Sequence, residues 1–570
     1  MTRHCLACLV PFAALLASTS LAAEPQADAP DLSIALAPVA DAQGRLTRLG
    51  VAIRFEAPPQ GDAIAEIAVT ANTVKTSADA MQGLVFTDRR GVIPVQAHDE
   101  AADGDNIERR WRALRPVAGS VTVAYRVPID PQQPDMAKPQ YELRAAEGGL
   151  SGAGNAFLVL PADRVERDVA VHWDLERAGP GARGISSLGI GDRHSSRALT
   201  PAEIASTYYM TGPIGTYAKG AFFGAWQGSF GFDGPDLMDW AARLQKFYGT
   251  FFHQRPASFG VLARTNRLNP GSGIGLTDSF AFTFGQQTPI GDLEGLLAHE
   301  MVHAWINSLS NSMDAPGGLA LSWFGEGLAV HYQRLLPYRA GLISRQAFLD
   351  DLNATAARYY TNALISTPND RIAKGFWKDT RIRVLPYDRG SLYFAKVDAD
   401  IRKASEGRRS LDDVVRRMLA ERRAGKPMNL ALWKRLLKAE LGTEGLADFN
   451  AMLAGRTVVP PSDAFGPCFQ RTTKPLKRFD LGFDPLVLVS RDPVIEGLKP
   501  GSAAAKAGLR NGDRILNRFP QDGLQRDQHS TLTLHLERGN RKFSLTYSPR
   551  GESLDTYQWQ MAPARAKCRR

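Results

Sequence analysis

The chain has 570 residues, of which 44% are hydrophobic and 22% are charged, and it carries a formal net charge of +10 at pH 7. This composition excludes a disordered or fibrous chain, and the length suggests three or four domains. No helix-turn-helix, zinc-finger or aromatic RNA-binding motif accompanies the positive charge, so we interpret it as solvated basic helix faces and predict no nucleic-acid partner.

Residues 1–22 have the pattern of a secretory signal peptide. Arg3 provides a short basic start, an apolar run extends from Cys5 to Leu16, and Ser20-Leu21-Ala22 supplies small residues before a cut at Ala23. No later segment approaches about 18 consecutive apolar residues, so we expect no transmembrane segment. We therefore expect a soluble, exported protein, periplasmic or secreted, with a formal charge of +9 once Arg3 is removed.

Short strand-like stretches dominate residues 23–185. Gly, Pro and Asp clusters separate Leu49–Phe55, Val121–Val127, Ala156–Leu160 and Val169–Leu175. The pattern predicts an N-terminal all-β domain, built as a sandwich, that carries no catalytic residues of its own.

The pattern changes over residues 186–455, where helical periodicity follows a strand-containing half. We expect a helix over 236–250 and a strand over 258–266. Further helices are predicted over 292–309, 322–335, 345–360, 389–404, 410–423 and 430–453. This region is predicted to be an α+β domain.

The sharpest motif in the chain is His299-Glu300-Met301-Val302-His303, followed by Glu326 in Trp323-Phe324-Gly325-Glu326-Gly327. Residues four apart lie on one face of a helix, so both imidazoles reach one metal ion, and a carboxylate from a second helix is a common third ligand. The motif predicts a zinc peptidase site with one ion per chain, held by His299, His303 and Glu326. His331 lies more than a turn beyond Glu326 and about 140° off its face, so we place it at the surface or behind the ligands.

The same residues suggest a mechanism. A zinc ion with three protein ligands leaves its fourth position to water, whose pKa falls toward about 7. Glu300 is then the general base that takes the proton of this water and delivers it to the leaving amine. The developing oxyanion needs a partner besides the metal, and a candidate lies in Leu385–Leu392.

The zinc motif, Trp323-x-x-Glu326-Gly327 and Pro386-Tyr387-x-Arg389-Gly390 together resemble the glycyl aminopeptidase family of gluzincin metallopeptidases. The resemblance implies a multidomain chain with a β-rich N-terminal domain, a thermolysin-like catalytic domain and a C-terminal PDZ domain. It also implies that Tyr387 donates a hydrogen bond to the transition-state oxyanion. Arg389 would pair either with a carboxylate behind the ligands or with a substrate carboxylate.

One segment departs from the family pattern. Members carry Gly-Leu-Glu-His on an edge strand, and its glutamate pairs with the substrate α-amino group. The best match here is Gly275-Leu276-Thr277-Asp278, in which Thr277 has no charge to offer an ammonium group. Asp278 replaces the glutamate only if the strand register allows it, because a shift of one residue turns a side chain to the other face.

Residues 456–475, with Pro460-Pro461 and Pro467, have the composition of a linker. Beyond it, Leu481-Gly482-Phe483 begins a predicted strand that continues to Ser490, and Gly497–Leu509 and Asn511–Leu516 follow. This pattern resembles a PDZ domain over residues 476–562.

The PDZ resemblance implies that the backbone amides of Leu481, Gly482 and Phe483 receive the terminal carboxylate of a peptide while the strand pairs with it. Asp480 stands where many such domains have glycine, which would weaken this capture. The alternative is a PDZ fold that only packs on the catalytic domain. Residues 563–570 form a basic tail.

Two of the four cysteines, Cys5 and Cys8, lie in the predicted signal peptide, which leaves Cys468 and Cys568. An even pair in an oxidising compartment indicates a disulfide. It would close a loop of about 100 residues, which the chain-entropy model associates with at most about 4.7 kcal/mol.

These observations favour an exported zinc metallopeptidase of aminopeptidase type, acting on peptides or proteins and assisted by peptide binding at its PDZ domain. One alternative is an endopeptidase without amino-terminal specificity, which Thr277 favours. The other is a catalytically weak peptide-binding scaffold that keeps zinc for stability. Glu300 and Tyr387 argue against the scaffold, because a structural zinc site is closed and needs neither a base nor an oxyanion donor.

Overall fold

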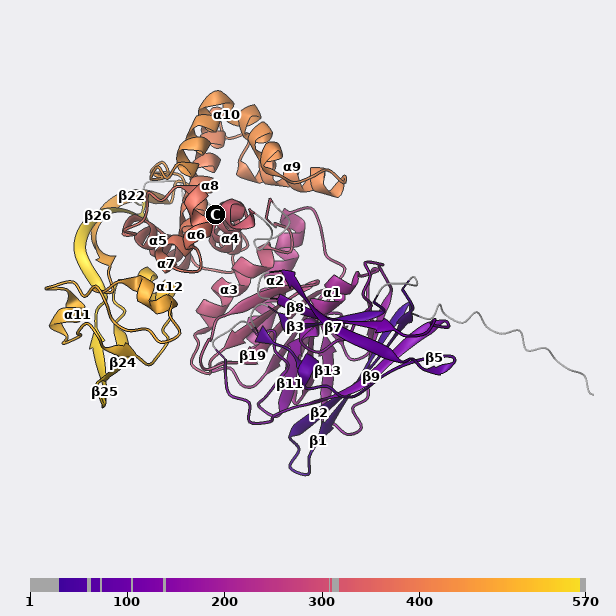
Figure 1. Cartoon of the computed structure of the whole chain (residues 1–570). Coiled ribbons are helices and arrows are strands. Elements are labelled where there is room, and N and C mark those ends of the chain that lie inside the picture. Colours follow the sequence, from indigo (N-terminus) through magenta and orange to yellow (C-terminus); the bar gives the residue numbers. More distant parts are fainter. Residues whose placement is uncertain are drawn as a thin grey trace, which may run out of the picture.

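The fold was obtained as a computed structural model, which describes residues 30–58, 63–71, 74–103, 106–136, 140–306, 308–309 and 317–563. The predicted signal peptide, nearly all of the basic tail and Cys568 lie outside these ranges. Figure 1 shows a β-rich N-terminal region in indigo to purple, a helical region in pink to orange and a small C-terminal domain in yellow. A β-rich first part and a helical region behind it agree with the predicted domain order.

The N-terminal region contains three sheets. The first has seven strands in the order β15 (Arg193–His194), β12 (Val169–Trp173), β1 (Leu32–Ala40), β2 (Leu46–Glu56), β9 (Ser120–Pro128), β5 (Gln82–Asp88) and β6 (Gly91–Val92). The second has four, in the order β4 (Val74–Lys75), β3 (Ala65–Ala71), β8 (Asn106–Ala113) and β7 (Val95–Asp103). The third has five, in the order β10 (Arg144–Ala146), β11 (Gly149–Ala153), β16 (Tyr208–Gly212), β13 (Arg183–Ser186) and β14 (Gly189–Ile190).

Alternating burial defines these strands. In β1, Leu32, Ile34 and Leu36 are fully buried while the residues between them are partly exposed, as expected for a strand with one face on the core. β1 is antiparallel to β2 and parallel to β12. The short helices η1 (Ser77–Asp79), η2 (Gly154–Ala156) and α1 (Pro201–Ala205) connect strands.

Two predictions for this region need correction. The strand expected over Ala156–Leu160 is instead the end of η2 and a single β-bridge at Leu160. The hydroxyl of Tyr125 donates to the Phe157 carbonyl (2.6 Å) and accepts the Val159 N–H (3.0 Å), so a side chain takes the place of a neighbouring strand. The boundary expected at residue 185 cuts the third sheet, because β16 completes it, and the β-rich region extends to Gly212.

The next region begins with a mixed sheet whose strand order is β17 (Ile214–Lys219), β18 (Phe222–Gln227), β19 (Phe259–Thr265), β21 (Ser279–Phe284) and β20 (Gly273–Leu276). β20 lies at the edge and pairs antiparallel with β21. α2 (Gly234–Phe251) crosses between β18 and β19, and its buried face joins one large core with the helices that follow.

Those helices are α3 (Ile290–Val302), α4 (Gly318–Arg339), α5 (Arg345–Tyr360), α6 (Asn369–Gly375), α7 (Thr380–Arg383), α8 (Leu385–Ala404), α9 (Leu411–Arg423) and α10 (Leu430–Leu453). The helix predicted to run to residue 309 ends at Val302, where His303 caps it. α10 is interrupted at Gly442, whose backbone is not helical. No helix within the described ranges combines the length and the apolarity needed to cross a membrane.

The C-terminal domain has its own small core, which includes Phe483, Ile495 and Leu534. β22 (Phe469–Phe479) pairs with β26 (Arg550–Met561), and β23 (Arg514–Ile515), β24 (Leu532–Arg538) and β25 (Arg541–Tyr547) form a second sheet. The remaining elements are η3 (Pro485–Val489), α11 (Ala503–Lys506) and α12 (Gln521–Arg526).

Two further predictions are wrong here. The predicted linker over 456–475 contains the first half of β22, because long-range pairing with β26 decides this strand. The strand expected up to Ser490 is absent, since residues 485–489 form the helix η3. Pro485 cannot donate a ladder hydrogen bond, and the Asp484 side chain accepts the Leu486 N–H (2.9 Å), which favours a helical start.

Candidate metal centre

Three side chains of the predicted ligand set converge between α3 and α4. His299 and His303 come from the end of α3, and Glu326 comes from the middle of α4. Glu326 Oε2 lies 3.2 Å from His299 Nε2 and 3.6 Å from His303 Nε2. One ligand atom from each of the three residues lies within 4.8 Å of the others, so a single ion can contact all three.

Hydrogen bonds at the far side of each ring decide which nitrogen faces the centre. His299 Nδ1 lies 2.9 Å from Gln333 Oε1, and His303 Nδ1 lies 3.1 Å from the Ile306 carbonyl. Both partners are oxygen acceptors, so each Nδ1 carries the proton and each Nε2 keeps its lone pair for a metal. Two imidazole nitrogens and one carboxylate with an open fourth position are the donor set of a catalytic zinc site, and these residues fit that ion.

The early end of α3 does not disturb this geometry. His303 has φ −64° and ψ −16°, which is still right-handed helical backbone. Its side chain therefore remains on the face of His299, one turn away, and the two ring centroids are 5.1 Å apart.

The electrostatics of His303 and Glu326 show that the site favours a positive charge. Burial by itself would lower the pKa of His303, but the charge and hydrogen bond of Glu326 raise it to about 9. Burial would raise the pKa of Glu326, yet the two histidines hold it well below its usual range. Glu326 is thus an anion that keeps a positive charge beside it, either a proton on His303 or a metal ion.

The glycines of the two helical motifs allow α4 and α8 to cross closely. A Cβ atom at Gly327 would lie 2.6 Å from Gly390 Cα, and one at Gly390 would lie 2.4 Å from the Trp323 carbonyl oxygen. Only glycine fits at both positions. Because Glu326 and Tyr387 stand beside this crossing, the glycines set the distance between the third ligand and the tyrosine.

Tyr387 belongs to the first turn of α8 and faces the metal centre. Its ring centroid lies 6.1 Å from that of His299, with an angle of 22° between the planes. Burial and the negative charges of Glu326 and Glu300 raise the pKa of Tyr387 well above its usual value. The phenol therefore keeps its proton and can act as a hydrogen-bond donor.

Arg389 does not face the substrate side. It is fully buried and donates to the carbonyls of Ile365 (2.8 Å) and Thr367 (2.7 Å), which lie in the loop before α6. The assignment of Arg389 to substrate binding, or to a carboxylate behind the ligands, is therefore wrong. Its buried guanidinium pairs with carbonyls of this loop, a contact that the sequence does not reveal.

A cavity of about 860 Å³ opens beside the metal centre. Its walls include Glu300 and His303 together with Gly275, Thr277 and Asp278 at the end of the edge strand β20. The structure thus brings the predicted base, one ligand and the predicted substrate segment to one space. Gly275 is exposed, and a Cβ atom there would meet nothing within 4 Å.

Thr277 and Asp278 differ in what they can offer a substrate. The Thr277 hydroxyl donates to the Glu203 carbonyl (2.7 Å) and its N–H donates to the Ser206 carbonyl (2.9 Å), so Thr277 anchors its own loop. Asp278 has a left-handed backbone (φ 49°), and its carboxylate lies 3.7 Å from Arg197. Burial raises the pKa of Asp278 above its usual value.

The predicted peptide-binding loop of the C-terminal domain is engaged internally. Leu481 and Phe483 are buried in the domain core, and the Gly482 N–H donates to Asp480 Oδ1 (2.9 Å). Lys499 Nζ lies 2.8 Å from the Asp480 carboxylate. Asp480 therefore occupies the amide that a terminal carboxylate would need, and a small cavity of about 270 Å³ separates the loop from Thr380 in α7.

The structure also shows where His331 lies and adds two residues that the sequence did not single out. His331 was expected at the surface or behind the ligands, and at 3% exposed it is not at the surface. Burial lowers its pKa well below the usual value. Gln333 and Asp351, which lie behind His299, were not foreseen. Gln333 follows Glu326 by two helical turns, and this spacing alone would have pointed to it.

Cys468 is buried, and because Cys568 lies outside the described ranges, the disulfide stays a prediction.

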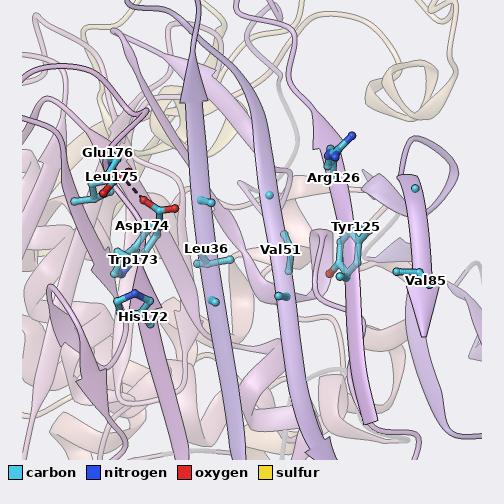
Figure 2. Close-up of a pocket in the computed structure, with 16 residues that line it drawn as sticks. Leu36, Val51, Val85, Tyr125, Arg126, His172, Trp173, Asp174, Leu175 and Glu176 are labelled. Carbon is cyan, nitrogen blue, oxygen red and sulfur yellow. Dashed lines mark hydrogen bonds between the residues drawn. The ribbon is translucent and has the colours of Figure 1, made fainter. Parts of the chain in front are cut away.

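A second cavity lies far from the metal centre, on the outer face of the seven-stranded sheet (Figure 2). It measures about 920 Å³, and small side chains such as Ala35, Ala52 and Ala124 form its floor. His172 and Arg126 project from strands on either side. None of the metal-centre residues lines it, so this cavity is separate from the metal centre.

Known proteins resemble both the segment that carries the metal ligands and the whole fold. Residues 292–367 match the M61 glycyl aminopeptidase family. No curated protein matches the chain. The structure of an aminopeptidase N family protein from Idiomarina loihiensis superposes with a TM-score of 0.65 at 14% identity, over 93% of this chain and 98% of that one.

Two other solved structures superpose less closely. An M1 zinc metallopeptidase from Deinococcus radiodurans gives a TM-score of 0.43 at 15% identity, over 76% of this chain and 94% of that one. Leukotriene A4 hydrolase from Saccharomyces cerevisiae gives 0.44 at 12% identity, over 74% and 67%. The chain therefore shares its multidomain architecture with an aminopeptidase N family protein, and the family match over His299, His303 and Glu326 supports a metallopeptidase of the gluzincin type.

Proposed function

We propose that the chain is an exported zinc-dependent peptidase of aminopeptidase type that uses one zinc ion per chain. The observation that carries the proposal is the convergence of His299, His303 and Glu326 beside an open cavity that is lined by His303 and Glu300. Hydrogen bonds to the Nδ1 atoms of both histidines turn their Nε2 atoms toward the centre. A zinc site that serves only stability would be closed, and no carboxylate such as that of Glu300 would line an open cavity beside it.

Each residue of the centre has a part in the proposed hydrolysis. Zinc bound by the three ligands would lower the pKa of a bound water toward about 7 and polarise the scissile carbonyl. Glu300 accepts the proton of that water and passes it to the leaving amine. The Tyr387 hydroxyl, which stays protonated, donates to the oxyanion that develops on the carbonyl oxygen.

Amino-terminal specificity requires an anion for the substrate ammonium group, and Asp278 is the candidate in the cavity. Its carboxylate is 40% exposed, and Arg197 lies at 3.7 Å, too far for a hydrogen bond. The second candidate function is an endopeptidase. It is favoured by Thr277, whose hydroxyl and N–H already donate to the carbonyls of Glu203 and Ser206, and by the size of the cavity.

Cleavage mapping by mass spectrometry tests the proposal. Matched peptide pools with free and with acetylated amino termini are incubated with the enzyme, and the Glu300→Gln protein serves as blank because it keeps the three ligands. Trimming confined to free amino termini supports the aminopeptidase, whereas internal cuts in the acetylated pool support the endopeptidase. A wild-type protein that binds zinc but cuts neither pool, or a Glu300→Gln protein that cuts as well as wild type, would refute the mechanism.

We also propose export and a PDZ-type C-terminal domain. Export follows from residues 1–22 and predicts a mature protein beginning at Ala23 with a Cys468–Cys568 disulfide, which intact mass with and without reduction can test. For the C-terminal domain, Asp480→Gly should strengthen binding of a peptide with a free terminal carboxylate and not of its amidated form. Equal binding of both forms would show that the terminal carboxylate is not recognised, and binding of neither form would indicate a domain that only packs on its neighbour.

A further inference from the structure

His299 is connected to the C-terminal domain by a continuous line of polar contacts. Behind the ring, Gln333 Oε1 accepts from Nδ1 (2.9 Å). The Gln333 amide nitrogen donates in turn to both oxygens of Asp351 on α5, at 3.2 and 3.3 Å. The Asp351 carboxylate also accepts from Arg526 of α12, which belongs to the C-terminal domain. We call Gln333, Asp351 and Arg526 the polar chain.

The polar chain determines the orientation of each group in it. A carboxylate can only accept hydrogen bonds, so Asp351 forces the NH₂ side of the Gln333 amide toward itself. The amide oxygen is then turned to His299, which must carry its proton on Nδ1. That tautomer leaves the lone pair of Nε2 free for the metal, so Asp351 fixes the state of the ligand atom through Gln333.

Arg526 is one of two cations that hold Asp351. The other is Arg334, which is almost fully buried and also donates to Ser391 (3.0 Å) and Thr355 (2.6 Å). Burial would raise the pKa of Asp351, but Arg334 and Arg526 lower it well below its usual range. The Arg526 side chain is 40% exposed and comes from outside the catalytic region.

α12 also contacts the helix that precedes Tyr387. Asp522 accepts from Thr380 and from Arg383 (2.9 Å), both in α7, and Gln525 donates to Thr380 (2.9 Å). α7 ends two residues before α8 begins. Figure 1 shows α12 facing α5 and α7. One short helix of the C-terminal domain thus supports the helices behind His299 and before Tyr387.

We propose that Arg526 is a positioning residue of the metal centre, which acts through Asp351 and Gln333 to hold the His299 imidazole for zinc. The inference rests on the proposed zinc site. It makes the C-terminal domain a part of the metal centre, whether or not that domain binds a peptide.

A purely structural role for Arg526 can be separated from this one, because other contacts dock the C-terminal domain on the same helix. The side chain of Asn353 in α5 donates to the Trp559 carbonyl (2.8 Å) and accepts the Trp559 N–H (2.7 Å). Among the described residues, the side-chain hydrogen bonds of Asn353 go to Trp559 and not to the polar chain. Asn353→Ala therefore loosens the same interface without touching the path to His299 and is the matched control.

Zinc affinity of the full-length protein, measured by competition with a chromogenic chelator, tests the inference. Removing a group that orients a ligand typically costs about 10–100-fold in affinity, which we expect for Gln333→Ala. Arg526→Ala should lose less, about three- to tenfold, because Arg334 still holds Asp351. Arg526→Lys should recover most of the loss, and Asn353→Ala should bind zinc like the wild type. Thermal unfolding identifies any variant that has not folded.

A double-mutant cycle decides whether Arg526 acts through Gln333. If it does, Arg526→Ala adds almost nothing to the loss in a Gln333→Ala background. Equal losses in both backgrounds, or a wild-type zinc affinity in folded Arg526→Ala, would overturn the inference while the zinc site stands. A wild-type protein that binds no zinc would instead refute the proposed function, and the inference would fall with it.

Discussion

Replacing Gly327 with alanine should push α4 and α8 apart at the point where they bring Glu326 and Tyr387 together. The added Cβ atom would lie 2.6 Å from Gly390 Cα, 2.8 Å from the Gly390 carbonyl carbon and 3.2 Å from the Phe394 ring. Two of these neighbours are backbone atoms of a buried helix, so they cannot move aside as a flexible side chain would.

The structure sets the size of the effect. Carbon atoms approach to about 3.5 Å, so the helices must separate by about 1 Å. Overpacking of this kind costs about 1–3 kcal/mol, partly offset by up to about 1 kcal/mol from the better helix propensity of alanine. A misplacement of about 1 Å at a catalytic group can lower turnover about 100-fold. We therefore expect turnover to fall about 100-fold in a protein that is still folded.

The assay combines kcat/KM on a peptide from the cleavage map with zinc content and thermal unfolding. Gly295→Ala is the matched control, because Gly295 lies in α3 one turn before His299 and its added Cβ atom meets nothing within 4 Å. That variant should turn over like the wild type and gain up to about 1 kcal/mol in stability. If Gly327→Ala matches Gly295→Ala in both turnover and unfolding midpoint, the close helix crossing does not position the site.

Four other outcomes are expected. Tyr387→Phe should keep zinc and lose about 100-fold in kcat with little change in KM, because the hydroxyl acts on the oxyanion alone; an unchanged kcat removes it from the mechanism. Asp278→Ala should raise KM for peptides with a free amino terminus and spare acetylated ones, and an equal effect on both contradicts its assignment as the amine anchor. Dialysis against a zinc chelator should abolish hydrolysis and one equivalent of zinc should restore it, whereas full activity without metal would exclude the mechanism. Burial keeps His331 neutral in the folded protein, because it lowers the pKa well below the usual value of about 6.5. Below pH 6.5 the unfolded chain takes up a proton at His331 that the folded protein does not. The free energy of unfolding therefore decreases as the pH falls below 6.5, by up to about 1.4 kcal/mol per pH unit. His331→Leu should remove that part of the slope in urea unfolding at pH 5.5 and 7.5, and a slope equal to that of the wild type would contradict it.

Much of the metal centre could be predicted because its signal is local. The spacing of His299 and His303 is a property of one helix, and it survives although α3 ends one residue before His303. Glu326 and Tyr387 lie on separate helices, and the resemblance of their short motifs to a peptidase family pointed to them. The glycines in those motifs have a reason that only the structure reveals, namely the contact between Gly327 and Gly390.

Predictions failed where a distant partner competes with a local pattern. Ala156–Leu160 has strand-like residues, but the Tyr125 hydroxyl satisfies its backbone. Residues 469–475 have the composition of a linker, but β26 pairs with them. Arg389 follows Tyr387 by two residues in the sequence, yet it points toward the loop before α6, because side chains two residues apart lie on opposite faces of a helix.

The sequence by itself predicted that His299, His303 and Glu326 come together and that a helical region follows a β-rich one, since helical spacing and strand alternation depend on residues close in the sequence. The tertiary structure alone decided what lies behind the ligands. Arg526 is 175 residues from Asp351 along the chain, and no periodicity relates the two. Their contact exists because β22, β26 and α12 fold the C-terminal domain back onto α5, and burial then requires a partner for every charge.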